Sequence, residues 1–191
     1  MQTIRVVSQL SADDLPLVRT LLDAARQRDG VEAIGEHKFL RVSSGQASGV
    51  KAILVSQDER LVGYANVERF PIKEGGRLSA EMVVHPDARR QGTASRMLAA
   101  IVDEAMAQNV DRVDIWAYRQ LPGTRELATK FGFEPSRTLL EICMPLPDAF
   151  EDAPLPPDVT LRSFRPGQDD AEWLALNNLV FENHPEQGNW D

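Results

Sequence analysis

The stretch that most constrains the fold of this chain covers residues 80–108. Its first part is an apolar run at 82–84 that ends at Pro86, whose missing backbone N–H prevents a strand from continuing in a ladder. Its second part has apolar side chains at positions 94, 98, 101, 102 and 105, which is the spacing of one helix face. The sequence therefore predicts a strand, a short turn and a helix in direct succession.

The turn between this strand and this helix contains Arg89, Arg90 and Gly92. A helix start leaves backbone N–H groups unpaired and carries the positive end of the helix dipole, so anions bind there readily. The turn therefore indicates a seat for a phosphate or pyrophosphate, although by itself it is also typical of an ordinary exposed loop. It is not a dinucleotide fingerprint, which needs G-x-G-x-x-G, and it lacks the Gly-Lys-Ser/Thr of a Walker loop.

The pattern Arg89-x-x-Gly92-x-Ala94 resembles the acetyl-CoA-binding signature Q/R-x-x-G-x-G/A of the GCN5-related N-acetyltransferase (GNAT) family. The resemblance implies an α/β fold of the α+β type with a mixed sheet, acetyl-CoA as co-substrate and no metal. It also implies that the turn amides hold the CoA pyrophosphate and that the strand backbone pairs with pantetheine. The cofactor-binding residues expected on this basis are Met82, Val83, Val84, Arg89, Arg90, Gln91, Gly92, Thr93, Ala94 and Ser95.

Composition narrows the class of protein further. The 29 acidic and 21 basic residues give a net charge of −8, which argues against a nucleic-acid partner because such binding draws on clustered positive charge. No apolar run approaches the roughly 20 residues that span a bilayer, and the N-terminus lacks the apolar core of a signal peptide, so we expect no membrane partner and a cytoplasmic location. The single cysteine, Cys143, cannot form an internal disulfide, and the apolar run at 139–144 predicts a strand with a buried thiol.

Local signals predict the order of the remaining elements. The run at 11–14 supplies helix-capping side chains ahead of Pro16, Gly30 is a suitable helix end, and the polar residues 57–60 indicate a hairpin. The expected strands lie at 4–10, 50–55, 61–69, 77–85 and 110–118. The expected helices cover the apolar face at 15–25, a short segment up to 42, the segment from 94 onward and 124–130.

A proline-rich stretch suggests a domain boundary. Residues 145–157 contain five prolines and three acidic residues, which is typical of a semi-rigid linker. We therefore expect an N-terminal domain at 1–146, a linker at 147–158 and a truncated second copy of the same fold at 159–191. The second copy would begin with a strand at 159–164 and a helix up to 181, as the first copy does. The alternative is that this strand and helix complete the first domain.

The two-copy layout and the closing sequence HPEQGNWD resemble an actinobacterial branch of the GNAT family with two tandem domains. In that branch, the resemblance implies, the N-terminal domain holds acetyl-CoA, and the acceptor partner is the cysteinyl amine of a cysteinyl-glucosaminyl-inositol. Glu36 and Glu186 match acidic positions that contact the acceptor, so we expect them to bind the substrate and to act as catalytic carboxylates. Their alternative role is that of solvated loop carboxylates. For His85 a structural hydrogen-bonding role is favoured over a cofactor contact.

One position departs from the family pattern. Catalytic members often carry a tyrosine that protonates the leaving thiolate, and Ala128 stands at the matching position, where it has no proton to give. The backbone N–H near Val84 is expected to stabilise the oxyanion. We therefore expect a monomer that binds acetyl-CoA and transfers acetyl groups poorly. Two alternatives stay open: a binding or regulatory module without turnover, and an acetyltransferase with another small amine acceptor.

Overall fold

The computed structural model describes residues 1–35, 38–40, 43, 49–70, 76–140, 142–146 and 154–182. The chain divides into two compact units, Met1–Glu134 and Pro135–Asp191. The elements of the first unit are β1 (Gln2–Val7), α1 (Asp14–Asp29), β2 (Val50–Gln57), β3 (Arg60–Phe70), β4 (Arg77–Val84), the 3-10 turn η1 (Pro86–Ala88), α3 (Thr93–Ala107), β5 (Arg112–Trp116) and α4 (Thr124–Lys130). The second unit contains α5 (Asp170–Val180).

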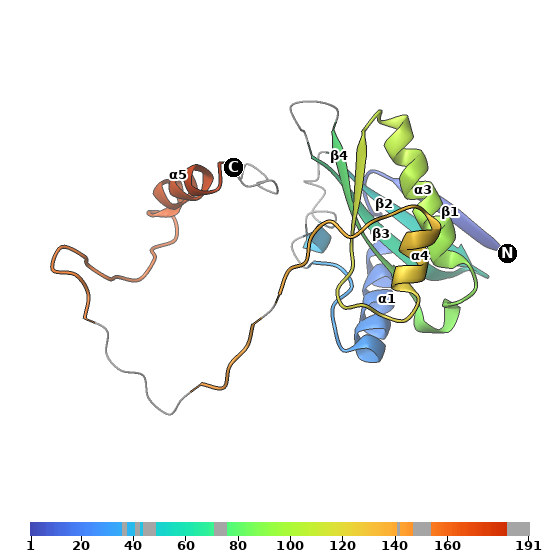
Figure 1. Cartoon of the computed structure of the whole chain (residues 1–191), viewed down its shortest axis with the longest axis horizontal. Coiled ribbons are helices and arrows are strands. Elements are labelled where there is room, and N and C mark those ends of the chain that lie inside the picture. The colour runs from blue at the N-terminus through green and yellow to red at the C-terminus, as the bar shows by residue number, and fades with distance from the viewer. Residues whose placement is uncertain are drawn as a thin grey trace. The chain divides into compact units, whose positions relative to one another are not determined.

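A five-stranded sheet in the order β1-β2-β3-β4-β5 forms the centre of the first unit (Figure 1). Neighbouring strands from β1 to β4 are antiparallel, whereas β4 and β5 are parallel. Parallel neighbours need a crossover connection, and α3 supplies it. The predicted hairpin is confirmed: Asp58 and Glu59 have positive φ angles of 49° and 64°, as a tight two-residue hairpin requires. The observed sheet therefore has the mixed character that the family resemblance implies.

Two apolar layers cover the two faces of this sheet. Successive residues of β2 alternate between them: Ala52 and Leu54 join the cluster that contains α1, whereas Ile53 and Val55 join the cluster that contains α3. The helix residues in these clusters are Val18, Leu21 and Ala25 of α1 and Met97, Leu98, Ile101 and Ala105 of α3. The two helices consequently lie on opposite faces of the sheet.

Both ends of α1 follow the sequence signals. The Asp14 N–H donates to Ser11 Oγ over 3.1 Å, and the Ser11 N–H donates to Asp14 Oδ2 over 3.0 Å, which is the reciprocal exchange of a capping box. At the other end Gly30 has a φ of 68°, and its N–H donates to the Arg26 carbonyl. These two ends fix where α1 begins and where it stops. Asp29 is its last residue.

A glycine in β3 sets how closely α3 approaches the sheet. A Cβ atom on Gly63 would lie 2.6 Å from Met97 Sδ and 3.3 Å from Thr93 Cγ2. Gly63 is paired with Val84, the last residue of β4. The start of α3 therefore packs directly over β3 at Gly63, beside the end of β4, because position 63 carries no side chain.

The second unit corrects three sequence-based predictions. The strands expected at 139–144 and 159–164 are wrong, because the described residues in both ranges are not in strands. The buried thiol is also wrong, because Cys143 is exposed. A strand is stable when its backbone groups pair with a neighbouring strand, and no described strand pairs with either range.

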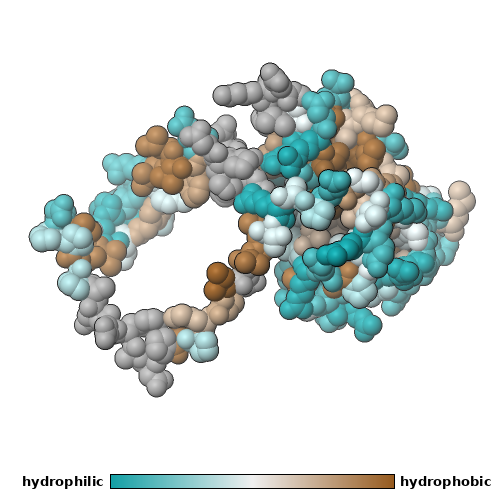
Figure 2. Space-filling model, in the orientation of Figure 1, coloured by the Kyte–Doolittle hydropathy of each residue, from teal (hydrophilic) through white to brown (hydrophobic). Residues whose placement is uncertain are grey.

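The apolar side chains of these ranges consequently lie on the surface of the second unit, where Figure 2 shows brown residues. They include Leu139, Leu140, Ile142, Met144, Val159, Leu161 and Phe164. The predicted helix is present as α5. The division between the two units after Glu134 assigns residues 135–146 to the second unit, whereas the sequence analysis assigns them to the N-terminal domain.

Candidate functional site

The strands β4 and β5 part before β4 ends. β4 pairs with β3 as far as Val84, but its pairing with β5 stops at Glu81, which lies opposite Trp116. The last three residues of β4, at 82–84, therefore have a paired edge toward β3 and an edge that β5 does not cover. We call this place the strand gap.

The direction of the backbone groups in the strand gap follows from the register. The His85 N–H donates to the Val62 carbonyl over 2.9 Å, so the backbone groups of His85 point toward β3. Backbone groups of successive strand residues point to alternate edges, so those of Val84 and Met82 point away from β3 and into the gap. The Val84 carbonyl accepts from Arg89 Nε over 3.1 Å, which leaves the Val84 N–H as a donor toward the gap.

Directly beyond the gap, the turn before α3 holds backbone donors around a left-handed residue. Gly92 is the N-cap of α3 with a φ of 83°, and no side chain caps this helix end. Added Cβ atoms at Gly92 would meet nothing within 4 Å, so the turn is open on this side. Because the first N–H groups of a helix have no intrahelical acceptor, the amides of α3's first turn are available to an anion.

The two arginines of the turn have different surroundings. Arg89 forms a two-pronged ion pair with Asp29, with Nη1–Oδ1 and Nη2–Oδ2 distances of 2.8 and 2.7 Å. Arg90 is exposed and has a left-handed φ of 63°. Thr93 is buried, and its hydroxyl accepts from Gln2 Nε2 over 2.8 Å. The Arg89 guanidinium thus contacts protein acceptors, whereas Arg90 is exposed, with Nη1 3.0 Å from the position that a Cβ would take on Gly123 at the start of α4.

The expected cofactor-binding residues form one continuous surface of strand end, turn and helix start. Val83 and Thr93 are exceptions, because the side chain of Val83 is buried in the α1-side core and Thr93 is also buried. Glu36 and Glu186, the expected acceptor-binding carboxylates, lie outside the described residues. Their roles stay predictions.

A buried charged cluster at the mouth of the gap escaped the sequence analysis. Glu81, the last β4 residue paired with β5, accepts from Lys38 Nζ over 2.6 Å and from the Tyr118 hydroxyl over 3.1 Å through Oε1. Its Oε2 accepts from the Gly35 N–H over 2.7 Å. The side chains of Glu81 and Lys38 are only 2% and 9% exposed. Burial, together with the charge of Glu81, raises the pKa of Tyr118 to about 12, so this hydroxyl stays protonated at neutral pH and donates its hydrogen bond to Glu81.

The sequence did contain one signal for this cluster. Glu81 is the one charged residue in the otherwise apolar and small run at 78–84. A buried carboxylate needs a cation and hydrogen-bond donors, but the sequence does not say which residues supply them. Lys38 and Tyr118 are distant in the chain, on the segment after α1 and beyond the end of β5. Only the fold brings them together.

The family model described as the acetyltransferase (GNAT) family matches residues 35–133, which include the strand gap, the turn and the Glu81 cluster. The chain belongs to this family. Among curated relatives, the mycothiol acetyltransferase of Thermobispora bispora is 36% identical over 98% of this chain and 61% of its own length. That of Acidothermus cellulolyticus is 38% identical over 92% of this chain and 53% of its own length. The chain thus spans between about half and three-fifths of these relatives.

The fold of the first unit is also that of solved GNAT structures. A protein from Clostridium acetobutylicum, described as a predicted acetyltransferase and solved with acetyl-CoA, superimposes with a TM-score of 0.55 and 18% identity, over 75% of this chain and 96% of that one. Within the described ranges of this GNAT chain, no cluster of three or more His, Cys, Asp or Glu residues could hold a metal. The described helices include none that is long and apolar enough to cross a membrane.

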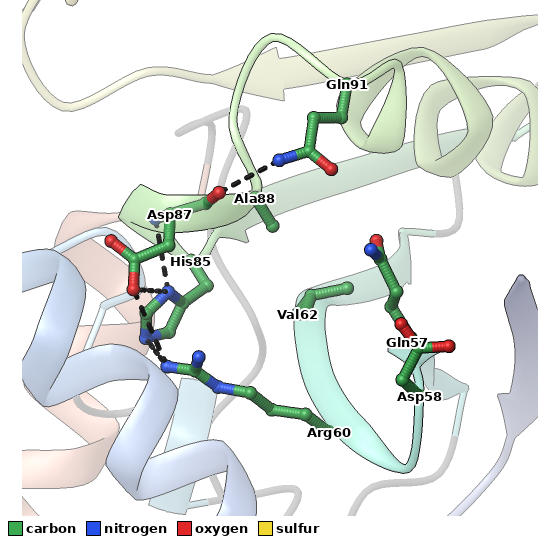
Figure 3. Close-up of a pocket in the computed structure, with 8 residues that line it drawn as sticks. All are labelled: Gln57, Asp58, Arg60, Val62, His85, Asp87, Ala88 and Gln91. Carbon is green, nitrogen blue, oxygen red and sulfur yellow. Dashed lines mark hydrogen bonds and ion pairs between the residues drawn. The ribbon is translucent and has the colours of Figure 1, made fainter.

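A cavity of about 240 Å³ lies on the β3 side of the GNAT turn, between the β2–β3 hairpin and η1 (Figure 3). His85 Nε2 lies 2.6 Å from Nη2 of Arg60. The Asp87 N–H donates to His85 Nδ1 over 3.2 Å, and the Asp87 carboxylate lies 3.7 Å from the same nitrogen. Burial lowers the pKa of His85, and the charge of Arg60 adds to this effect. His85 thus holds the turn to β3, and the Asp58 and Asp87 carboxylates make this cavity unsuitable for phosphate.

Proposed function

We propose that the first unit binds acetyl-CoA with its pyrophosphate on the turn amides at 90–95 and its pantetheine arm along the strand gap. The observation that carries this proposal is the early end of the β4–β5 pairing at Glu81, directly followed by an uncapped helix start. The residues present fit such a ligand. Gly92 leaves open space where a side chain would stand, and Arg90 supplies an exposed positive charge.

We further propose that the acceptor is a small-molecule amine, the cysteinyl amine of a cysteinyl-glucosaminyl-inositol. The support is the name of the curated relatives, mycothiol acetyltransferase, together with the resemblance of the closing sequence. Glu36 and Glu186 are proposed to contact this acceptor. The same proposal includes a tandem duplication, in which residues 159–191 form the beginning of a second GNAT domain. It also includes that the protein is a monomer and is cytoplasmic.

The chemistry asks three things of the protein. Bound acetyl-CoA would supply an acetyl thioester. The Val84 N–H, which points into the gap, can donate to the carbonyl oxygen as negative charge develops there. A base must take a proton from the attacking amine, and an acid must protonate the thiolate as the C–S bond breaks and the C–N bond forms. Ala128 in α4 cannot supply that acid.

The described residues of the first unit do not supply every group that the base and acid steps need. Both oxygens of Glu81 are engaged by Lys38, Tyr118 and the Gly35 N–H, so this carboxylate serves as an acceptor of existing hydrogen bonds. We therefore propose that the first unit holds acetyl-CoA and that efficient transfer needs groups outside residues 1–134. The alternative, a binding module without turnover, is favoured by the same two observations, Ala128 and the engaged Glu81.

Release of free CoA thiol tests this division of roles. With the cysteinyl-glucosaminyl-inositol as acceptor, we expect the 191-residue chain to release CoA about 10² to 10⁴ times more slowly than the longer Thermobispora bispora relative, because loss of a general acid or base typically costs this factor. Binding of acetyl-CoA by the same chain is measured separately. Equal rates for the two proteins would show that the 191-residue chain already carries every group that efficient transfer needs.

A further inference from the structure

The guanidinium of Arg89 has all three of its nitrogens in use. Nε donates to the Val84 carbonyl over 3.1 Å, and Nη1 and Nη2 bind the two oxygens of Asp29 over 2.8 and 2.7 Å. The Asp29 side chain is only 7% exposed, and that of Arg89 is 31% exposed. A planar fork that meets a carboxylate in this way is rigid and specific in direction. Arg89 therefore links the end of β4 to the end of α1.

Asp29 joins both strands that border the gap. As the last residue of α1, it binds Arg89 beyond β4, and its carbonyl accepts from Arg119 Nη1 beyond β5 over 3.3 Å. An acidic side chain at a helix C-terminus is unfavourable, because the helix dipole is negative there. The ion pair with Arg89 offsets this cost. The end of α1 thus ties together the chain segments that follow β4 and β5.

A paired arginine offers little net charge to a phosphate. Because the Asp29 carboxylate neutralises it, the Arg89 guanidinium cannot be the main cation for a pyrophosphate in the turn. The neighbouring Arg90 is exposed, and it is the arginine of the turn for which no ion pair with a described residue is recorded. The two arginines of the turn therefore differ in the charge that they can offer to a ligand.

We propose that Arg89 is a positioning residue that acts through Asp29 and Val84, and that Arg90 is the arginine that contacts the cofactor phosphates. Arg89 holds the Val84 carbonyl, which leaves the Val84 N–H directed into the gap, and it fixes the start of the turn against α1. This inference rests on the proposed binding of acetyl-CoA. It differs from a simple interpretation of the signature, in which both arginines bind phosphate.

Three substitutions separate the two interpretations in calorimetric titrations with acetyl-CoA. Asp29→Asn removes a negative charge and releases Arg89, so a phosphate-binding Arg89 would then bind acetyl-CoA as tightly as before or more tightly. If Arg89 positions the turn, Asp29→Asn and Arg89→Gln each weaken binding about 10-fold, and the double variant is no weaker than either one, because both break the same unit. Asp23→Asn, on the exposed side of α1, is the control with the same change in charge.

Arg89→Lys is the decisive variant, because lysine keeps the charge but cannot form the fork. We expect it to weaken binding as much as Arg89→Gln does, with an unchanged dependence of affinity on salt. Arg90→Gln should weaken binding and also flatten the salt dependence, because it removes a direct charge contact. Thermal unfolding verifies that each variant is folded at the titration temperature.

The outcomes separate this inference from the proposed function. If the wild-type chain does not bind acetyl-CoA, the proposed function fails, and the inference fails with it. If the wild type binds and Arg89→Lys retains its affinity, or Asp29→Asn tightens binding beyond the effect of Asp23→Asn, the positioning role is overturned and the proposed function stands.

Discussion

Replacement of Lys38 by methionine should lower the free energy of unfolding by about 3–5 kcal/mol, which is the usual cost of removing one partner of a buried ion pair. The reason is that Glu81, only 2% exposed, would lose the cation with which it is paired in a buried site. Urea unfolding, followed by circular dichroism, measures the change. A loss of this size is a large part of the stability of a domain of this length.

A second lysine–glutamate pair in the first unit provides the control. Lys51 pairs with Glu104 of α3, but its side chain is 37% exposed, so Lys51→Met should cost about 1 kcal/mol or less. The double variant Lys38→Met with Glu81→Gln should recover most of the loss. A neutral amide needs no cation: its oxygen can accept from the Gly35 N–H, and its NH2 group can donate to the oxygen of the Tyr118 hydroxyl, which accepts as well as donates. If Lys38→Met costs no more than Lys51→Met, the Glu81 cluster does not depend on its buried charge pair.

The parts of the fold that the sequence predicts are those with local causes. The strand, turn and helix around Gly92 follow from an apolar run, a proline and a helical repeat within 29 residues, and all three are present. The end of α1 at Gly30 and the hairpin at 57–60 likewise depend on the conformations that particular residues favour.

The parts that the sequence does not predict depend on contacts between distant residues. The position of Arg89 in the turn suggests a phosphate ligand. In the fold, however, its guanidinium is paired with Asp29, which lies 60 positions away in the chain. The Glu81 cluster joins three segments that no local pattern connects. The run at 139–144 has the composition of a strand, but composition cannot say whether a neighbouring strand is there to pair with it.

Replacement of Gly92 by valine should weaken acetyl-CoA binding by at least about 100-fold, or about 2.7 kcal/mol. Gly92 has a φ of 83°, which a β-branched residue adopts only with strain, so valine would shift the turn amides. Its side chain would also fill the open space proposed for the pyrophosphate, where an added Cβ meets nothing within 4 Å. Calorimetric titration with acetyl-CoA measures the loss.

Gly132 provides the control for the backbone cost. It has a φ of 74° in the same unit, and its Cβ position is also open, but it follows α4 rather than the turn. Gly132→Val should therefore show a similar loss of stability with an affinity for acetyl-CoA close to that of the wild type. An equal loss of affinity in both variants would mean that general destabilisation, and not the turn itself, explains the effect of Gly92→Val.

The most direct measurement of the central claim is the titration of the wild-type 191-residue chain with acetyl-CoA. The strand gap and the turn predict one saturable site, from which unlabelled CoA displaces acetyl-CoA and which raises the unfolding temperature as ligand is added. A folded chain that shows neither heat of binding nor a shift in unfolding temperature at millimolar acetyl-CoA would contradict the claim that the first unit is a cofactor-binding GNAT domain.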